Sequence, residues 1–281
     1  MRLKIYLDFI KIEHTLFALP IAYAGAVLAG ELTLKLTLLI LTTFTGLRTF
    51  AMACNRIIDR EIDAKNPRTA KRHLPAGLIS LREAYAIAIA GLVIYFVSAY
   101  LINMTAFILS PIPAVVSYVY PYLKRFTCLS HYFLGLSVAF ALLGGWIAVK
   151  DSILFPENVL LFAIALFFWE AGFDMIYALQ DAEFDQKEGL HSIGGHFGVK
   201  FAKKFSILNH LIFFLFLVLA FKNEPIVRLS LPIVAFLLIL EHYIIREKHD
   251  EERIQISFFY LNALMSASVF LLIFAQFLLG F

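Results

Sequence analysis

The sequence is poor in charge and in cysteine, and it lacks the common nucleotide-binding motifs. Only 16% of its 281 residues are charged, and its two cysteines are Cys54 and Cys128. Two cysteines in a chain of this length give no support for a disulfide framework. Neither GxxxxGK[ST] nor GxGxxG occurs, which argues against a nucleotide-driven pump and a dinucleotide-dependent enzyme. No soluble segment combines basic and aromatic residues, so no nucleic-acid partner is expected.

Hydrophobic runs fill most of the chain. Hydrophobic residues make up 61% of the sequence, the mean hydropathy is +0.81, and 29 residues are phenylalanine. These values predict a polytopic membrane protein. We therefore expect an all-α membrane protein, one domain over residues 1–281, with a tight hairpin at Asn103 between its third and fourth spans. Nine runs are long enough to span a bilayer, at about 12–30, 36–54, 83–102, 105–122, 131–149, 157–180, 205–221, 226–245 and 257–280.

The basic residues are distributed unevenly among the segments that join these runs. Of the 24 Lys and Arg residues, Arg48 lies within a run, and nearly all the others lie in every second connecting segment, beginning with the N-terminus. The other connections contain only Lys35, Lys150, Lys222 and Arg228. The positive-inside rule therefore predicts a cytoplasmic N-terminus and an outer C-terminus. Charges before the first run, and the many later spans, favour an uncleaved first helix over a signal peptide.

The stretch Ala53–Gly77 is where the second apolar run ends and charge begins. Asn55, Asp59 and Asp63, here called the first ladder, recur every four residues, which places three oxygen-bearing side chains on one face of a helix. Stacked carboxylates repel each other unless a cation lies between them, and oxygen ligands suit Mg²⁺. Three basic residues follow that would neutralise phosphate oxygens: Arg68, Lys71 and Arg72. Taken alone, the pattern fits a Mg²⁺–diphosphate site and equally a charged loop at the end of a membrane helix.

A second stretch repeats this spacing at the end of the sixth run. Tyr177, Asp181 and Asp185, the second ladder, again recur every four residues. The repetition favours the metal interpretation and predicts that both ladders face one central cavity on the cytoplasmic side. It also predicts a pseudo-repeat of two four-helix units plus a ninth helix. The loops that follow the ladders, 64–82 and 186–204, are expected to act as lids.

Other charged residues lie within or near the apolar runs. Arg48 lies two helical turns before the first ladder, where a buried charge costs roughly 2.5–3.5 kcal/mol, so it is expected to face a cavity unless its side chain extends to the interface. Glu170 and Asp174 precede the second ladder on the same run, and Asp174 is a candidate to join it. His191 and His196 lack the partner spacing of a zinc site, which favours a plain loop role.

The segment YVYPYLKR ends the fourth run. Lys124 and Arg125 are candidate phosphate contacts, although basic residues in such positions also serve as ordinary flanks of a membrane helix. Tyr118 and Tyr122 are candidates to stabilise a carbocation through their ring faces. An interfacial aromatic belt is the alternative for both tyrosines.

These stretches resemble the UbiA superfamily of intramembrane prenyltransferases. The segment NRIIDREIDAKNPRTAKRHLPAG resembles the family's N-x-x-x-D-x-x-x-D motif with its NPRT and R-x-LP-x-G extension, and YALQDAEFD resembles the second aspartate-rich motif. YPYLKRFT is similar to a segment of the 4-hydroxybenzoate branch, and Arg48 falls where that branch has an arginine. The start KIEHTLFALP is similar to members associated with menaquinone made by the futalosine route. The similarity spans nearly the whole chain.

The resemblance implies nine membrane helices around a central cavity, with two Mg²⁺ ions holding an isoprenyl diphosphate. Asp59, Asp63, Asp181 and Asp185 would be the catalytic carboxylates. The implied ligands of the metal and the diphosphate are these four residues together with Asn55. Candidate contacts of the phosphates and of the acceptor are Arg48, Arg68, Arg72, Lys124 and Arg125, with Tyr118, Tyr122 and Tyr177 as aromatic contacts.

The implied activity is Mg²⁺-dependent transfer of a polyprenyl group to a ring carbon of 4-hydroxybenzoate or a related hydroxynaphthoate, in ubiquinone or menaquinone biosynthesis. The expected partners are polyprenyl diphosphate, an aromatic acid and membrane lipid, with no obligate protein partner. Two alternatives stay open: a transferase of the same superfamily with a haem, chlorophyll or glyceryl-phosphate acceptor, and a cation-coupled secondary transporter. Transporter sites usually lie at the bilayer midplane, whereas these acids lie at predicted helix ends. The sequence leaves the acceptor, the prenyl length, the general base and the oligomeric state open.

Overall fold

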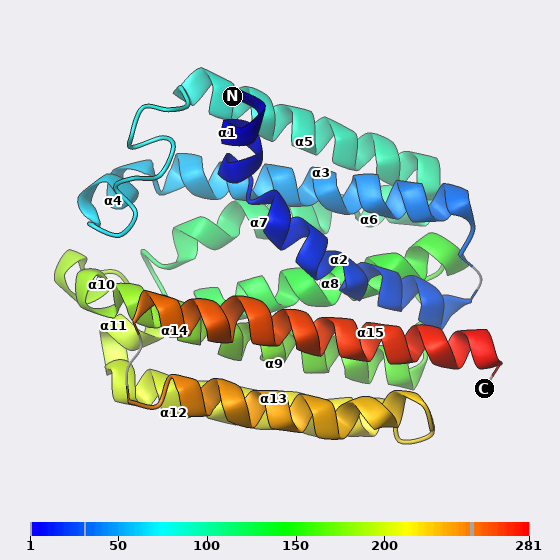
Figure 1. The fold of residues 1–281 in the computed structure, drawn as a ribbon. Helices are drawn as coiled ribbons and strands as arrows, with labels where there is room; N and C mark the ends of the chain where they lie inside the picture. Colours follow the sequence, from blue (N-terminus) through cyan, green and yellow to red (C-terminus); the bar gives the residue numbers. More distant parts are fainter. Residues whose placement is uncertain (1, 31, 248–249, 281) are drawn as a thin grey trace. The chain divides into compact units, whose positions relative to one another are not determined.

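The structure, a computed structural model, describes residues 2–30, 32–247 and 250–280, and these are helical almost throughout with no strand among them (Figure 1). The all-α prediction is confirmed. The chain divides into two compact units, one of Met1–Leu19 with Thr33–Tyr122 and the other of Pro20–Leu32 with Leu123–Phe281. That these units form one domain, as expected from the sequence, stays a prediction.

The membrane-spanning prediction is confirmed for eight of the nine runs. The first run corresponds to α2 (Ile12–Ala29), whose apolar part, Ala18–Ala29, is shorter than a typical span, so the ninth span stays a prediction. Within the described residues, the eight segments long and apolar enough to cross a membrane are Leu34–Ile58, Leu81–Ile102, Met104–Leu123, Ser130–Lys150, Glu157–Glu188, Val199–Ala220, Val227–Ile244 and Glu251–Leu279.

The first unit is built on two long helices, α3 (Leu34–Ile58) and α5 (Leu81–Ile102), which lie side by side (Figure 1). Gly46 and Gly91 lie where the two helices come closest, because a Cβ on Gly46 would be 2.9 Å from the Gly91 carbonyl oxygen. Small residues allow such close helix packing in membranes. The unit also contains the start of α2 and four shorter helices: α1 (Arg2–Phe9), α4 (Arg60–Lys65), α6 (Met104–Leu109) and α7 (Pro111–Leu123).

The predicted hairpin at Asn103 is confirmed. Asn103 is the single residue between α5 and α6, and its side-chain Oδ1 accepts a hydrogen bond from the Ala106 amide at 2.7 Å. The returning chain is fixed by Tyr95, whose hydroxyl donates to the Ser110 carbonyl at 3.0 Å. The fourth predicted run is split into α6 and α7 at Ser110, because Pro111 has no N–H with which to continue α6.

The N-terminal segment forms two helices. α1 ends at Phe9, and Lys11 has a positive φ of 53°, so the chain changes direction before α2. Phe9 is fully buried in a cluster with Ile79 and residues of α3 and α5. The Tyr6 hydroxyl donates to Glu83 at 2.7 Å, which fixes α1 beside the start of α5.

The second unit has α9 (Glu157–Ala178) at its centre, packed between α8 (Ser130–Lys150) and α12 (Val199–Ala220) (Figure 1). Trp169 on α9 donates its indole N–H to Asn262 Oδ1 at 2.9 Å and so connects α9 to the last helix. A π-helical turn, Ile256–Leu261, precedes that last helix. The remaining helices are α10 (Ala182–Glu188), α11 (Ile193–Phe197), α13 (Ser230–Ile244), α14 (Glu251–Gln255) and α15 (Asn262–Leu279).

Close packing of backbones also joins the C-terminal half of α2 to α8. A Cβ on Gly25 would lie 1.9 Å from the Leu142 carbonyl oxygen, and one on Gly145 would lie 1.9 Å from the Ala22 carbonyl oxygen. No side chain larger than hydrogen fits at either position. The two glycines therefore fix how α2 crosses α8.

The prediction of a long loop over residues 186–204 is wrong. Only residues 189–192 and 198 of this segment lie outside α10, α11 and α12. The hydropathy pattern missed the start of α12 because that turn is amphipathic: Lys200 and Lys204 are exposed while Ala202 and Ser206 are buried. The loop predicted at 64–82 is largely confirmed, since residues 66–80 join α4 to α5 without a helix.

Candidate functional site

The first ladder lies on a break between two helices. α3 ends at Ile58, Asp59 has φ −89° and ψ 2°, and α4 begins at Arg60. The predicted uninterrupted helix is therefore wrong at this point. The helical hydrogen-bond pattern between ladder residues is kept across the break. The Asp59 amide donates to the Asn55 carbonyl at 3.0 Å, and the Asp63 amide donates to the Asp59 carbonyl at 2.7 Å. The side chains of Asn55 and Asp59 are in contact, with Nδ2 donating to Oδ2 at 3.3 Å.

Asp63 is held by the loop that follows the first ladder. Its carboxylate is buried, and Oδ1 accepts a hydrogen bond from Arg72 at 2.7 Å. In the described part of the chain, the buried Oδ2 has no hydrogen-bond partner. The Thr69 hydroxyl donates to the Asp63 carbonyl at 3.1 Å, so the basic loop folds back onto the ladder. Arg72, a predicted phosphate contact, is here an ion-pair partner of a predicted metal ligand.

The NPRT loop between α4 and α5 is held by its own turns. Asn66 Oδ1 accepts from the Arg68 amide at 3.0 Å, an Asx turn that places the half-buried Arg68 next to α4. Further along, the carbonyl of His73 accepts the amides of Leu78 and Ile79. Burial, and secondarily the charge of Arg56, lowers the pKa of His73 from its ordinary value.

The second ladder has the same construction. α9 ends at Ala178, a 3₁₀ turn covers Leu179–Asp181, and α10 begins at Ala182. Asp181 has φ −103° and ψ 0°, so the predicted continuous helix is wrong here too. Asp185 is buried, whereas Tyr177 and Asp181 are half-buried.

Small residues of α11 pack directly against the second ladder. A Cβ on Gly195 would lie 2.9 Å from the Cβ of Asp185. Ser192 caps α11 by accepting the Gly195 amide at 3.1 Å. Lys124 and His131 lie close enough to Asp185 to interact with it electrostatically. Lys124 therefore lies near the second ladder, and its role as a phosphate contact stays a prediction.

A buried histidine–carboxylate pair was missed in the sequence. His131 Nδ1 lies 2.7 Å from Asp174 Oδ2, and both side chains are buried. Nε2 of His131 is buried with no hydrogen-bond partner among the described residues. Asp174 is thus bonded to His131 on α8. A histidine at the first turn of an apolar run was the available signal, but nothing in the sequence placed it near Asp174.

The candidate tyrosines on α7 are neighbours. The hydroxyls of Tyr118 and Tyr122 are 3.4 Å apart and their ring centroids are 5.7 Å apart. Tyr118 is 47% exposed. Lys124 and Arg125 follow α7 and are half-buried, and the Lys124 carbonyl accepts the His191 amide at 2.6 Å.

The predicted site residues fall into two groups, one in each unit. The first unit contains the first ladder with Arg48, Arg68, Arg72, Tyr118 and Tyr122, and the second unit contains the second ladder with Lys124 and Arg125. Arg48 is half-buried on α3, two turns before Asn55. Within the first group the structure shows contacts between Asn55 and Asp59, between Asp63 and Arg72, and between Tyr118 and Tyr122. One cavity for both groups stays a prediction.

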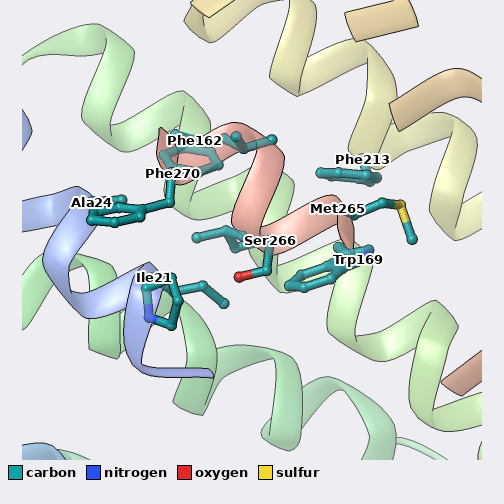
Figure 2. A pocket seen from close by; sticks show the side chains of 11 residues that line it. Ile21, Ala24, Phe162, Trp169, Phe213, Met265, Ser266 and Phe270 are labelled. Carbon is teal, nitrogen blue, oxygen red and sulfur yellow. The ribbon is translucent and has the colours of Figure 1, made fainter. Parts of the chain in front are cut away.

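An apolar pocket lies within the second unit, among α2, α9, α12 and α15 (Figure 2). Among the described residues no charged side chain lines it, so the lining offers no cation to a diphosphate. The hydroxyl of Ser266, which points into it in Figure 2, is buried with no hydrogen-bond partner among the described residues. The lining is almost wholly apolar. Its other lining residues include Ile21, Phe162, Trp169, Phe213, Met265 and Phe270.

Comparison with known proteins gives one consistent result. The sequence profile of the UbiA prenyltransferase family matches residues 18–264. Among solved structures, the apo structure of a UbiA homologue from Aeropyrum pernix K1 is 37% identical with a TM-score of 0.82, over 96% of this chain and 98% of that one. A UbiA homologue from Archaeoglobus fulgidus bound to GPP and Mg²⁺ is 24% identical with a TM-score of 0.76, over 96% and 99% of the two chains, and shows the shared fold alone.

A curated relative matches part of the chain. A protein named 4-hydroxybenzoate octaprenyltransferase, from Francisella tularensis subsp. mediasiatica (strain FSC147), is 30% identical over 173 residues. The match covers 62% of this chain and 60% of the relative. Together with its apolar helices, the profile match shows that this protein is an integral, multi-pass membrane protein that belongs to the UbiA prenyltransferase family.

Proposed function

We propose that this protein transfers a polyprenyl group from an isoprenyl diphosphate to a ring carbon of an aromatic acid, 4-hydroxybenzoate or a related hydroxynaphthoate, in quinone biosynthesis. The observation that carries the proposal is the pair of aspartate ladders, each built on a helix break with its central carboxylate at the break. Membership of a prenyltransferase family and the name of the Francisella relatives support the reaction and the acceptor class.

The donors of the two ladders fit Mg²⁺. All are carboxylate or amide oxygens, which this ion prefers. The buried Oδ2 of Asp63, which has no hydrogen-bond partner within the described ranges, is a ligand atom of the required kind. Bound Mg²⁺ would neutralise charge on the diphosphate and so make it a better leaving group. The residues that would hold it are Asn55, Asp59 and Asp63 in one ladder and Asp181 and Asp185 in the other.

The basic residues bind and orient the diphosphate in this proposal. Arg72 holds the Asp63 carboxylate in place through its 2.7 Å bond. Arg68, four residues earlier in the same loop, and Arg48 on α3 supply positive charge for the phosphate oxygens or the acceptor carboxylate. Lys124, near Asp185, and the next residue, Arg125, would do the same in the second unit. These five cations offset the negative charge that develops as the diphosphate leaves.

The aromatic and apolar residues protect the cationic prenyl group. The ring faces of Tyr118, Tyr122 and Tyr177 stabilise positive charge. Apolar helices exclude the water that would capture an allylic cation. The hydroxyl on the acceptor ring makes the ring carbon nucleophilic, and that carbon then bonds to the prenyl group.

A ring proton must leave after the new bond forms, and His131 is the proposed acceptor. The Asp174 carboxylate beside Nδ1 favours the tautomer with hydrogen on Nδ1, which leaves Nε2 free to take a proton. This arrangement matches that of a histidine base oriented by a carboxylate in other enzymes. Its interaction with Asp185 places His131 near the second ladder.

The distribution of basic residues supports an orientation. Nearly all lie on the side of the N-terminus and of the two ladders, so we place these in the cytoplasm and the C-terminus outside. Labelling of a single cysteine introduced at Phe126 by an impermeant reagent tests this, because Phe126 is exposed and follows α7. Labelling in inverted vesicles but not in intact cells supports the orientation, and the reverse result contradicts it.

The direct test is an assay with purified protein in detergent. A radiolabelled polyprenyl diphosphate is offered with 4-hydroxybenzoate, with a hydroxynaphthoate or with a glyceryl phosphate, in Mg²⁺ or in EDTA. Product with one of the aromatic acids, in Mg²⁺ alone, supports the proposal and identifies the acceptor. Product with the glyceryl phosphate alone, or equal product in EDTA, contradicts it.

A further inference from the structure

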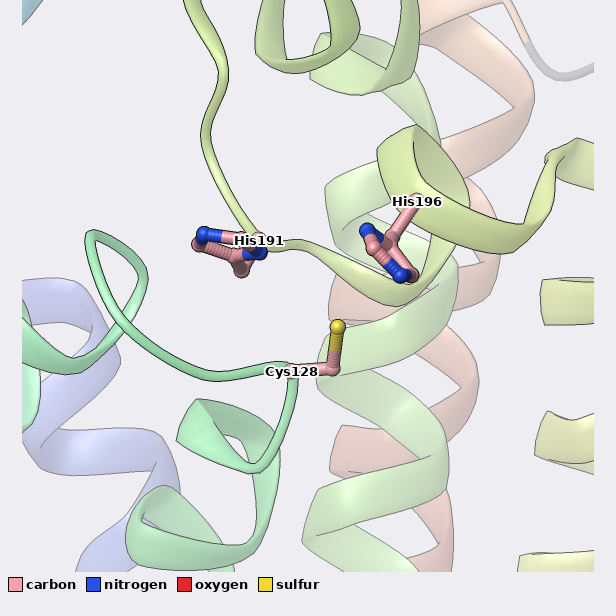
Figure 3. Close-up of side chains that lie close together, drawn as sticks. All are labelled: Cys128, His191 and His196. Atoms are coloured by element: carbon pink, nitrogen blue, oxygen red, sulfur yellow. The ribbon is translucent and has the colours of Figure 1, made fainter.

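Three side chains with nitrogen and sulfur donors meet in the second unit, outside both ladders (Figure 3). Cys128 lies in the segment between α7 and α8, His191 precedes α11, and His196 lies within it. One ligand atom from each residue lies within 4.8 Å of the other two. Sequence spacing favoured a plain loop role for the two histidines, because the third member comes from a distant segment.

The two segments that carry these side chains are fixed to each other by the backbone. The His191 amide donates to the Lys124 carbonyl at 2.6 Å, four residues before Cys128. Ser192 caps α11 and so orients the turn that carries His196. The imidazole rings of His191 and His196 have centroids 5.6 Å apart. The cluster therefore follows from the local fold and does not depend on the first unit.

The geometry is close to that of a zinc centre. Tetrahedral zinc with its usual bond lengths holds nitrogen and sulfur ligands roughly 3.5 Å apart, so a shift of about 1 Å would bring these three atoms to binding distance. Cys128 and His191 are half-buried and His196 is exposed, which leaves the side chains room to move. One thiolate and two imidazoles suit zinc, whereas the oxygen donors of the ladders suit Mg²⁺.

We propose that Cys128, His191 and His196 bind one Zn²⁺ ion, with water in the fourth position, and that this ion joins the segment after α7 to α11. Binding breaks the S–H bond of Cys128, forms a zinc–sulfur bond and releases the proton to solvent. Zinc binding would also affect the second ladder, because Gly195 of α11 packs against Asp185. The ion would hold α11 against the second ladder.

The test uses the full chain in detergent, with its affinity tag removed and without substrates, so that the result does not depend on prenyl transfer. Co²⁺ is added as the probe, because a cobalt–thiolate bond gives a charge-transfer absorption that oxygen ligands do not give. We expect this band to saturate at one Co²⁺ per protein, to disappear when Zn²⁺ is added, and to persist in excess Mg²⁺. Co²⁺ binding without the band would place the ion on oxygen ligands and overturn the proposal.

Substitutions identify the ligands. Cys128→Ser and His196→Gln should each abolish the band or weaken Co²⁺ binding at least tenfold, and Cys54→Ser is the matched control that should leave both unchanged. Cys54 is the other cysteine and is buried in the first unit. Unchanged binding in Cys128→Ser or in His196→Gln would show an adventitious site and contradict the assignment.

Thiol chemistry gives a second, independent measurement. Zinc binds the thiolate form of cysteine, so binding must displace the thiol proton of Cys128. Zn²⁺ must compete with that proton, and its affinity should therefore fall as the pH falls. Bound Zn²⁺ should slow alkylation of Cys128 at least tenfold, measured by mass spectrometry, with Cys54 as the internal reference for unfolding. Equal alkylation rates with and without Zn²⁺ would overturn the proposal.

Discussion

Asp59 and Asp181 occupy equivalent backbone positions in the two units. Each follows the end of a long apolar helix and precedes a short one, with φ −89° and ψ 2° at Asp59 and φ −103° and ψ 0° at Asp181. This region of backbone space is sparsely populated and is common at active sites. The relationship supports the predicted pseudo-repeat more directly than sequence identity does. It also puts the central carboxylate of each ladder at a break between two helices.

The ion pair between Asp63 and Arg72 should contribute to stability. Arg72→Ala leaves a buried carboxylate without its partner, so we expect the free energy of unfolding to fall by about 1–3 kcal/mol. Thermal unfolding in detergent measures the change, and Lys71→Ala is the exposed neighbouring control. The loss should shrink in an Asp63→Asn background, because the amide carries no charge. Equal losses in both backgrounds would show that Arg72 acts elsewhere.

Gly195 should be required for the position of Asp185. Gly195→Ala places a methyl group within 2.9 Å of the Asp185 Cβ, so the carboxylate or α11 must move. Displacement of a catalytic group by about 1 Å typically costs on the order of 100-fold in rate, and we expect that loss in kcat/KM. Gly144→Ala is the matched control, since no neighbouring element in the described part of the chain lies within 4 Å of its Cβ position. Full activity in Gly195→Ala would contradict the placement of Asp185.

His131 should affect the chemical step more than substrate binding. His131→Gln keeps a donor for Asp174 but removes the proton acceptor, so kcat should fall roughly 100-fold or more while the affinity for prenyl diphosphate is retained. Steady-state kinetics and equilibrium binding separate the two effects. Loss of binding with unchanged kcat would instead assign His131 a purely structural role.

The sequence predicts the helical fold well because the relevant signals are local. Hydropathy located eight of the spans, and Asn103 marked the hairpin that the structure confirms. The four-residue spacing correctly predicted contact between Asn55 and Asp59. No proline or glycine lies at the breaks at Asp59 and Asp181, so the sequence predicted a continuous helix through each ladder.

Contacts between distant segments could not be predicted. His131 meets Asp174 only because α8 packs on α9, and Cys128 meets His191 and His196 only because a loop bonds back to Lys124. A single sequence contains no local pattern that predicts which side chains from distant segments will be in contact. The loop predicted at 186–204 is wrong for a different reason: α10 and α11 are too short, and the first turn of α12 is too amphipathic, to give an apolar run. Its role as a lid stays a prediction.

The most direct test of the central claim is prenyl transfer by four variants in saturating Mg²⁺. Asp59→Ala and Asp181→Ala should each abolish turnover and keep the thermal unfolding profile of the unmodified chain. Glu61→Gln and Glu183→Gln, exposed acids that flank the ladder positions, should retain activity. Loss confined to the two aspartate variants is the predicted result. Full activity in both of them would contradict the assignment of the ladders as the site that binds the metal and the diphosphate.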